Sequence, residues 1–197
     1  MLPVFATNRL EVIILYAAFA IWLLPEIISS FTDRFGKVLT VNDRASGIVL
    51  LVCIWLGVFV SINIAFAARS FAILWHRTSL FAIGIFLMLA GVAFRWYSIR
   101  ILGKYFTRQV AIQPGQTVVE NGPYHWIRHP SYSGALLTIF GMGLAFGNWL
   151  SLIGVMVLAF IGYSYRVSVE EKTLVSALGE PYRQYMKRTK RFIPFVY

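Results

Sequence analysis

The stretch Gly122-Pro-Tyr-His-Trp-Ile-Arg-His-Pro-Ser-Tyr-Ser-Gly134 is a polar, ring-rich connector that stands directly before two apolar segments. We expect those segments to be helices at about 131–146 and 149–165, with only two residues between them. So short a link predicts a helical hairpin. A second polar block begins at Arg166, directly after the hairpin. The hairpin should therefore bring the two polar blocks together at one surface.

The composition is that of a membrane protein, with 58% hydrophobic and 13% charged residues. Apolar runs of about 20 residues, enough to cross ~30 Å of hydrocarbon, recur along the chain. Three of them predict helices at roughly 10–31, 47–67 and 80–98. We therefore expect an all-α integral membrane protein with about five transmembrane helices, a C-terminal helical hairpin and cytosolic amphipathic helices.

The formal net charge of +10 comes from basic residues whose positions in the loops indicate the membrane topology. With five spans and the N-terminus outside, fifteen of the eighteen Lys and Arg residues fall on the inner side. The inner set begins with Arg34, Lys37 and Arg44 in the first loop. This asymmetry is what the positive-inside rule predicts. It indicates a multi-pass protein with a cytoplasmic C-terminus and with anionic headgroups as neighbours, and it argues against nucleic-acid binding.

The segment after the second hairpin helix carries two adjacent carboxylates. Drawn as a helix, it has one apolar stripe formed by Val167, Leu174 and Leu178. Glu170 and Glu171 project within that stripe, and Arg166 precedes Glu170 by one turn, so the two could form an ion pair. A carboxylate pair in an apolar stripe is costly unless cations or hydrogen-bond donors meet it. The pattern fits either a buried site or an interfacial helix.

Two histidines of the connector, His125 and His129, lie four residues apart. That spacing suggests a metal site, but Pro123 and Pro130 bracket the pair, and no cysteine or third histidine is near it. We therefore expect no metal. Hydrogen bonding to a polar ligand is the favoured role, with Arg128 offering a fork for a carboxylate.

Other polar and small residues have packing or anchoring interpretations. Glu26 lies inside the first apolar run, and we expect its carboxylate to face protein or the membrane interface. Gly143 and Gly147 have the spacing that lets membrane helices approach closely, which we favour over a nucleotide loop. Tyr182 and Tyr185 share one face of a short helix, where they could anchor the chain at the interface or contact a ligand.

Together, the motifs have a recognisable order. They are Gly122-Pro-Tyr-x-x-Ile-Arg-His-Pro-x-Tyr132, the hairpin, Arg166-x-x-x-Glu-Glu171, Leu-Gly-x-x-Tyr-x-x-Tyr185 and a Pro-containing tail. This combination resembles the isoprenylcysteine carboxyl methyltransferase family and, more broadly, the integral-membrane methyltransferases that include phospholipid N-methyltransferases. The resemblance covers roughly residues 100–197, and the first three spans match only in kind.

The resemblance implies S-adenosylmethionine as methyl donor, bound at the cytosolic face. The predicted cofactor-binding residues are Tyr124, Arg128, His129, Pro130, Tyr132, Glu171 and Tyr182. Arg166 and Glu170 are the predicted catalytic residues, placed nearest the transferred methyl group and an acceptor that arrives from the lipid. On this interpretation residues 1–197 form a single membrane domain, with a three-helix part at 1–98 and a cofactor-binding methyltransferase core at 99–197.

The acceptor stays open at this point. A prenylcysteine carboxylate needs no base, whereas a phospholipid amine must lose a proton, for which Glu170 is the candidate. Two other classes share part of the pattern. NADPH-dependent sterol-type membrane reductases resemble the Arg-His-Pro-x-Tyr loop but are larger, and a non-catalytic transport or assembly subunit should carry charges along its spans. The sequence predicts no oligomeric state.

Overall fold

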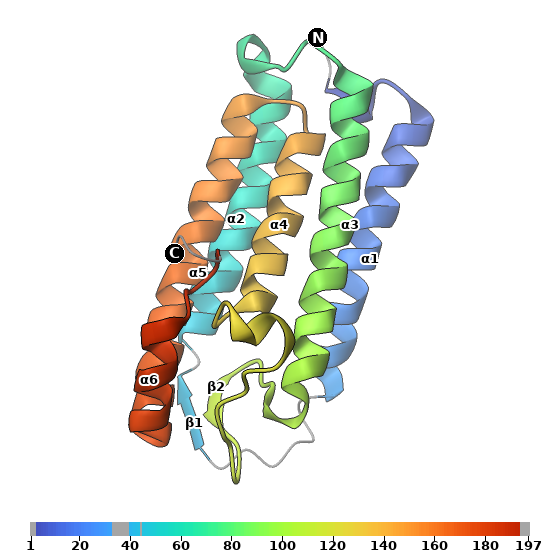
Figure 1. The fold of residues 1–197 in the computed structure, drawn as a ribbon. Coiled ribbons are helices and arrows are strands. Elements are labelled where there is room, and N and C mark those ends of the chain that lie inside the picture. Colours follow the sequence, from blue (N-terminus) through green and yellow to red (C-terminus); the bar gives the residue numbers. More distant parts are fainter. Residues whose placement is uncertain (1–2, 33–39, 44, 194–197) are drawn as a thin grey trace.

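The computed structural model describes residues 3–32, 40–43 and 45–193. Its longer helices are α1 (Arg9–Thr32), α2 (Ala45–Ala67), α3 (Arg77–Leu102), α4 (Pro130–Ala145), α5 (Trp149–Leu178) and α6 (Glu180–Arg188). The strands are β1 (Thr40–Asp43) and β2 (Val110–Ile112), and the 3-10 turns are η1 (Val4–Ala6), η3 (Arg69–Phe71), η4 (Gly103–Tyr105) and η5 (Gly122–His125). Helices α1 to α5 run side by side, and β1, β2, α6 and the connector 103–129 gather at one end, which we call the polar end (Figure 1).

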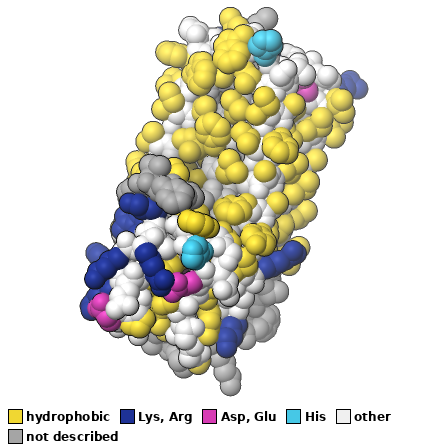
Figure 2. Space-filling view, in the orientation of Figure 1, with side chains coloured by type: hydrophobic (Ala, Val, Ile, Leu, Met, Phe, Trp, Pro, Cys, Tyr) yellow, Lys and Arg dark blue, Asp and Glu magenta, His cyan; other side chains and the backbone are white. Residues whose placement is uncertain are grey.

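Within the described residues, α1, α2, α3 and α5 are long and apolar enough to cross a membrane. Their outward side chains include large exposed hydrophobic groups such as Ile13, Phe59 and Phe86. Apolar side chains cover most of the visible length of the bundle, while most visible Lys and Arg lie toward the polar end (Figure 2). A surface of this kind is stable in lipid, and the chain is an integral membrane protein.

Helix α4 is the shortest of the predicted spans, with 16 residues. At 1.5 Å per residue it extends about 24 Å, less than the thickness of the hydrocarbon layer. Most of its side chains are buried. The five predicted apolar helices are thus present, but four of them, not five, have the length of a membrane span.

Helices α3 and α4 meet along a line of glycines. A Cβ atom added to Gly84 or Gly91 of α3 would lie 2.6 Å or less from backbone atoms of α4, and the same holds in reverse for Gly141 of α4. Such close backbone approach is typical of membrane helices, where van der Waals packing drives association. The seven-residue spacing of these α3 glycines keeps them on one face. This contact holds α4, and therefore the site, rigidly against α3.

The predicted hairpin of α4 and α5 is confirmed. Gly147 turns the chain at φ 67°, and the Asn148 side chain caps α5 by accepting hydrogen bonds from two backbone amides. Gly143 lies against Leu152 and Val155 of α5, as its packing interpretation predicts.

Helix α5 is longer than the expected range of 149–165. It continues without a break to Leu178 and ends at Gly179, where φ is 65°. No glycine or proline interrupts residues 163–178, so the segment with the two carboxylates is the last part of the same helix.

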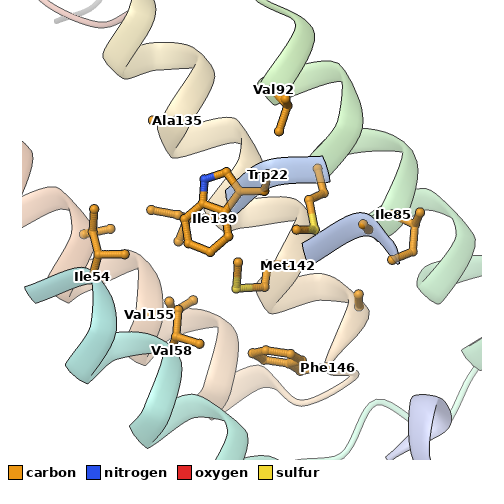
Figure 3. Close-up of a cluster of buried hydrophobic side chains, with 14 of the residues drawn as sticks. Trp22, Ile54, Val58, Ile85, Val92, Ala135, Ile139, Met142, Phe146 and Val155 are labelled. Carbon is orange, nitrogen blue, oxygen red and sulfur yellow. The ribbon is translucent and has the colours of Figure 1, made fainter. Parts of the chain in front are cut away.

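The apolar core receives side chains from α1 to α5. Trp22, Ile54, Met142 and Phe146 lie together in its centre (Figure 3). Toward the polar end, β1 pairs with β2 in antiparallel fashion and joins the first loop to the connector. This small sheet is absent from the all-α prediction. Arg34, Lys37 and Arg44, which the charge argument places on the inner side, lie outside the described residues, as does Pro194 of the tail.

Candidate active site

The connector and the start of α4 hold three rings against the polar end of α5. Its turn η5 buries Tyr124. Pro130 then takes the first position of α4, where a missing amide hydrogen has no cost. His129 and Tyr132 flank this start of the helix, and their rings stack with 5.6 Å between centroids and 12° between planes.

A cavity of about 80 Å³, which we call the small cavity, lies between this connector and α5. Four predicted site residues line it, namely Tyr124, His129, Tyr132 and Glu170. The rest of its wall is made by Leu102, Tyr105, Phe106, Thr107, Gln109, Val110, Ala111, Ile112, Gln116, Ser131, Thr173 and Leu174. The part of the connector before η5 therefore forms much of the site, which the sequence analysis missed.

Glu170 is the carboxylate of the small cavity. The Tyr132 hydroxyl donates a hydrogen bond of 2.8 Å to Glu170 Oε2. His129 Nδ1 lies 3.9 Å from the same oxygen. The Glu170 side chain is 28% exposed, so the carboxylate is held on one side and open to a ligand on the other. Burial raises the pKa of the Tyr124 hydroxyl, and the Glu170 charge raises it further, so Tyr124 stays a neutral donor.

Arg166 takes its hydrogen-bond acceptors from α2 and the connector, although Tyr132 lies next to both Arg166 and Glu170. Its Nη1 donates to Ser46 Oγ of α2 at 2.7 Å, and its Nη2 donates to the backbone oxygen of Arg108 at 2.5 Å. Among the described residues, the ion pair that the sequence allows between Arg166 and Glu170 is not formed. Each group finds partners on a different element, and a buried guanidinium needs such fixed acceptors.

Arg166 instead lines a second cavity, of about 610 Å³, which we call the large cavity. Its wall includes Trp22, Leu23 and Ile27 of α1, Ile48, Leu50, Leu51, Ile54 and Trp55 of α2, and Ala135 and Tyr163 of α4 and α5. Charged side chains also line it: Glu26, Asp43, Arg95, Arg108 and Arg166. The wall is mainly apolar, with a group of arginines facing it.

The two cavities share part of their walls. Phe106, Thr107, Gln109 and Tyr132 line both. A ligand in one cavity is therefore separated from a ligand in the other by a single layer of side chains.

Glu171, the neighbour of Glu170, belongs to a buried ion cluster. Its carboxylate lies 2.8 Å from Arg128 Nε, 2.7 Å from Arg191 Nη2 and 3.4 Å from His129 Nε2. The Glu171 side chain is 4% exposed. Breaking one partner of such a buried cluster leaves an uncompensated charge, which costs about 3–5 kcal/mol.

The C-terminal segment is tied to the connector through this cluster. The backbone amides of Arg128 and His129 donate to the carbonyl oxygens of Lys190 and Arg191, at 2.7 and 3.1 Å. The Tyr185 hydroxyl of α6 donates to the Tyr124 carbonyl at 2.6 Å. We call this set of contacts between residues 185–191, the connector and Glu171 the tail clamp.

Of the predicted cofactor-binding residues, Tyr124, His129 and Tyr132 line the small cavity, and so does Glu170, which was predicted to be catalytic. Arg128, Pro130, Glu171 and Tyr182 are outside both linings, behind the connector or in the tail clamp. Burial raises the pKa of the Tyr182 hydroxyl, so it too stays neutral.

A polar network at the large cavity was not predicted. The guanidinium of Arg95 meets Glu26, with Nε 2.6 Å from Oε1, and Arg108 Nη2 lies 3.0 Å from Oε2. The expectation that Glu26 faces protein is confirmed. A signal for the pair was present, because Glu26 and Arg95 are opposite charges within separate apolar runs, and such residues usually pair.

The residues that line both cavities lie in a part of the chain that is similar to known proteins. The model of the isoprenylcysteine carboxyl methyltransferase (ICMT) family matches residues 82–176. A protein-S-isoprenylcysteine O-methyltransferase of Schizosaccharomyces pombe is 30% identical over 109 residues, which cover 48% of this chain and 46% of that protein. A protein of the same name from Xenopus laevis is 31% identical over 121 residues, covering 60% of this chain and 42% of that one.

A solved structure has a similar fold. It is described as the eukaryotic intramembrane Ras methyltransferase ICMT, and it matches with a TM-score of 0.56 and 24% identity over 80% of this chain and 55% of that chain. The chain spans about half the length of the curated relatives it matches. The matched region runs from α3 through Glu171 and includes Arg166, Glu170 and the whole small cavity. Residues 82–176 thus match the isoprenylcysteine carboxyl methyltransferase family, and the chain shares the fold of the solved structure.

Proposed function

We propose that the protein transfers a methyl group from S-adenosylmethionine to the carboxylate of a lipidated, prenylcysteine-type acceptor. The observation that carries this proposal is the pair of cavities with a common wall at Tyr132. One cavity is small and contains the Glu170 carboxylate, and the other is large and mainly apolar. A polar donor and a lipid acceptor need such a division, with their reacting atoms close together.

The chemistry of the small cavity suits the sulfonium end of the donor. A carboxylate at Glu170 and the rings of Tyr124 and Tyr132 favour a positive centre. A cavity of about 80 Å³ holds only part of such a molecule, so the wall formed by 105–116 would move outward around the remainder. When bound, S-adenosylmethionine supplies a methyl group that is already activated, so a carboxylate acceptor requires no general base.

The side chains then have separate tasks. Glu170, oriented by Tyr132, offsets positive charge in the small cavity. Arg166 binds the acceptor's carboxylate in the large cavity, where it is held by Ser46 and by the Arg108 carbonyl. The apolar wall between α1 and α2 receives the lipid chain and excludes water. A carboxylate acceptor is favoured over an amine because arginines outnumber carboxylates in this wall.

The membrane orientation follows from charge. Exposed cations of the polar end, among them Arg100, Lys104 and Lys172, would face the cytoplasm, which puts the N-terminus outside.

The proposal is tested by incubating purified protein with S-adenosylmethionine carrying a labelled methyl group and one of three acceptors. These are N-acetyl-S-farnesyl-L-cysteine, its neutral amide, and phosphatidylethanolamine. The expected result is a base-labile methyl ester of the first acceptor alone. Label on the phospholipid would replace the carboxylate with an amine acceptor, and label on none of the three would overturn the proposed function.

A further inference from the structure

The large cavity is lined by three arginines and two carboxylates. Arg95 and Arg108 both bind Glu26, which α1 supplies at the side of the cavity. Asp43 is occupied differently, because its oxygens accept hydrogen bonds from the backbone amides of Ala45 and Ser46 at the start of α2. Among the described residues of this wall, the arginines therefore outnumber the carboxylates by one.

Arg166 has a different environment. Its hydrogen-bond partners include the Ser46 hydroxyl and the Arg108 carbonyl, both neutral, and its side chain is nearly completely buried. Arg95 and Arg108, in contrast, both form ion pairs with Glu26. Among the described residues, Arg166 is therefore the arginine of this wall that has no ion-pair partner.

We propose that Glu26 is a specificity-determining residue: by occupying Arg95 and Arg108 it directs the acceptor's carboxylate to Arg166. The inference rests on the proposed function, because it concerns the acceptor of that reaction. Glu26 lies outside the family-matched residues 82–176, so this control is exerted by α1 on a site that α4 and α5 build.

Removal of the Glu26 charge would take the carboxylate partner away from two guanidinium groups that line the same cavity as Arg166. Arginine forks bind carboxylates in bidentate fashion, so the released pair would hold the acceptor strongly but away from Arg166. Binding of an anionic acceptor would become tighter while transfer became slower. A neutral ligand of the same shape would bind as before.

The test compares Glu26→Gln with Glu11→Gln, a change at a buried glutamate near the other end of α1 that lines neither cavity. The probes are N-acetyl-S-farnesyl-L-cysteine and its amide, titrated calorimetrically in detergent without cofactor. For Glu26→Gln we expect about fivefold tighter binding of the acid, unchanged binding of the amide, and about tenfold lower kcat with a lower KM. Glu11→Gln should change none of these values, and Glu26→Asp should restore them.

Equal shifts for acid and amide would assign Glu26 a packing role and overturn the inference, as would unchanged binding of both. If Glu26→Gln does not fold, two arginine variants provide the test. Arg166→Gln should weaken binding of the acid at least tenfold, and Arg108→Gln should weaken it at most about twofold. Equal losses in these two variants would also overturn it.

The binding results are independent of catalysis. Acid-selective binding without any methyl transfer would defeat the proposed function and leave the inference standing. If the protein transfers methyl groups and Glu26→Gln behaves as the wild type does, the proposed function would stand and the inference would be overturned.

Discussion

The small and large cavities differ in wall, volume and origin. Every residue that lines the small cavity lies between Leu102 and Leu174, within the family-matched region. The large cavity takes much of its wall from Trp22 to Trp55, outside that region. On the proposed function, the family-matched region would bind the donor, whereas the first two helices would adapt the acceptor side to a particular lipid. Mutations in the two walls should then separate the donor and acceptor functions.

Arg166→Ala should have the largest effect, a loss of about 100-fold or more in kcat/KM. The reason is that a buried charge contact to the acceptor is lost, while the small cavity keeps its residues. Radiometric methyl transfer gives the rate, and calorimetry with S-adenosylhomocysteine should give a wild-type affinity. A matched loss of S-adenosylhomocysteine affinity would contradict the separation, and Arg183→Ala on the exposed face of α6 serves as control.

Glu170→Gln should weaken S-adenosylmethionine binding by about 30-fold, because the carboxylate that offsets the sulfonium charge becomes neutral. Binding of S-adenosylhomocysteine, whose sulfur is uncharged, should weaken less. Affinity for N-acetyl-S-farnesyl-L-cysteine should stay the same. Glu180→Gln, an exposed glutamate of α6, is the matched control. Loss of acceptor affinity alone would place Glu170 on the wrong side of the common wall.

Leu51→Trp should raise KM for a farnesylated acceptor by about tenfold, since the added ring fills part of the large cavity. KM for an acceptor with a shorter chain should rise less. Leu56→Trp provides the control, because Leu56 is exposed on the same helix and does not line the cavity. Identical KM values for both variants would show that the lipid chain lies elsewhere.

Tyr132→Phe should have the smallest effect, about fivefold on kcat/KM. It removes one hydrogen bond to Glu170 but leaves the ring in the common wall. Because Tyr132 lines both cavities, the affinities for donor and acceptor should change little and kcat should fall most. A change confined to acceptor affinity would contradict the hydrogen bond's assigned role on the donor side.

The sequence predicts what is local. Two apolar runs with a two-residue link predict the hairpin. The ring-rich segment before these runs predicts the aromatic residues that line the small cavity. The positions of Glu170 and Glu171 do not follow in this way. They are adjacent in the chain, yet one faces the small cavity and the other the tail clamp. Which of the two glutamates faces the cavity depends on the partners that other elements supply.

Contacts between residues that lie far apart in the sequence could not be predicted from it. Glu26 and Arg95 are 69 residues apart, and Arg166 is 120 residues from Ser46. Each charge can be recognised as unusual in an apolar run, but its partner depends on how the helices pack. The α3–α4 glycine contact, which sets that packing, is visible in the sequence only as a spacing of seven.

On the proposed function, donor and acceptor occupy separate cavities that share one wall. This separation is tested by a calorimetric titration of S-adenosylhomocysteine into protein already saturated with N-acetyl-S-farnesyl-L-cysteine. Both ligands should bind together, with the affinity for S-adenosylhomocysteine within about twofold of its value without acceptor. Competition, in which saturating acceptor abolishes S-adenosylhomocysteine binding, would mean a single shared site and would disprove the separation of the two cavities.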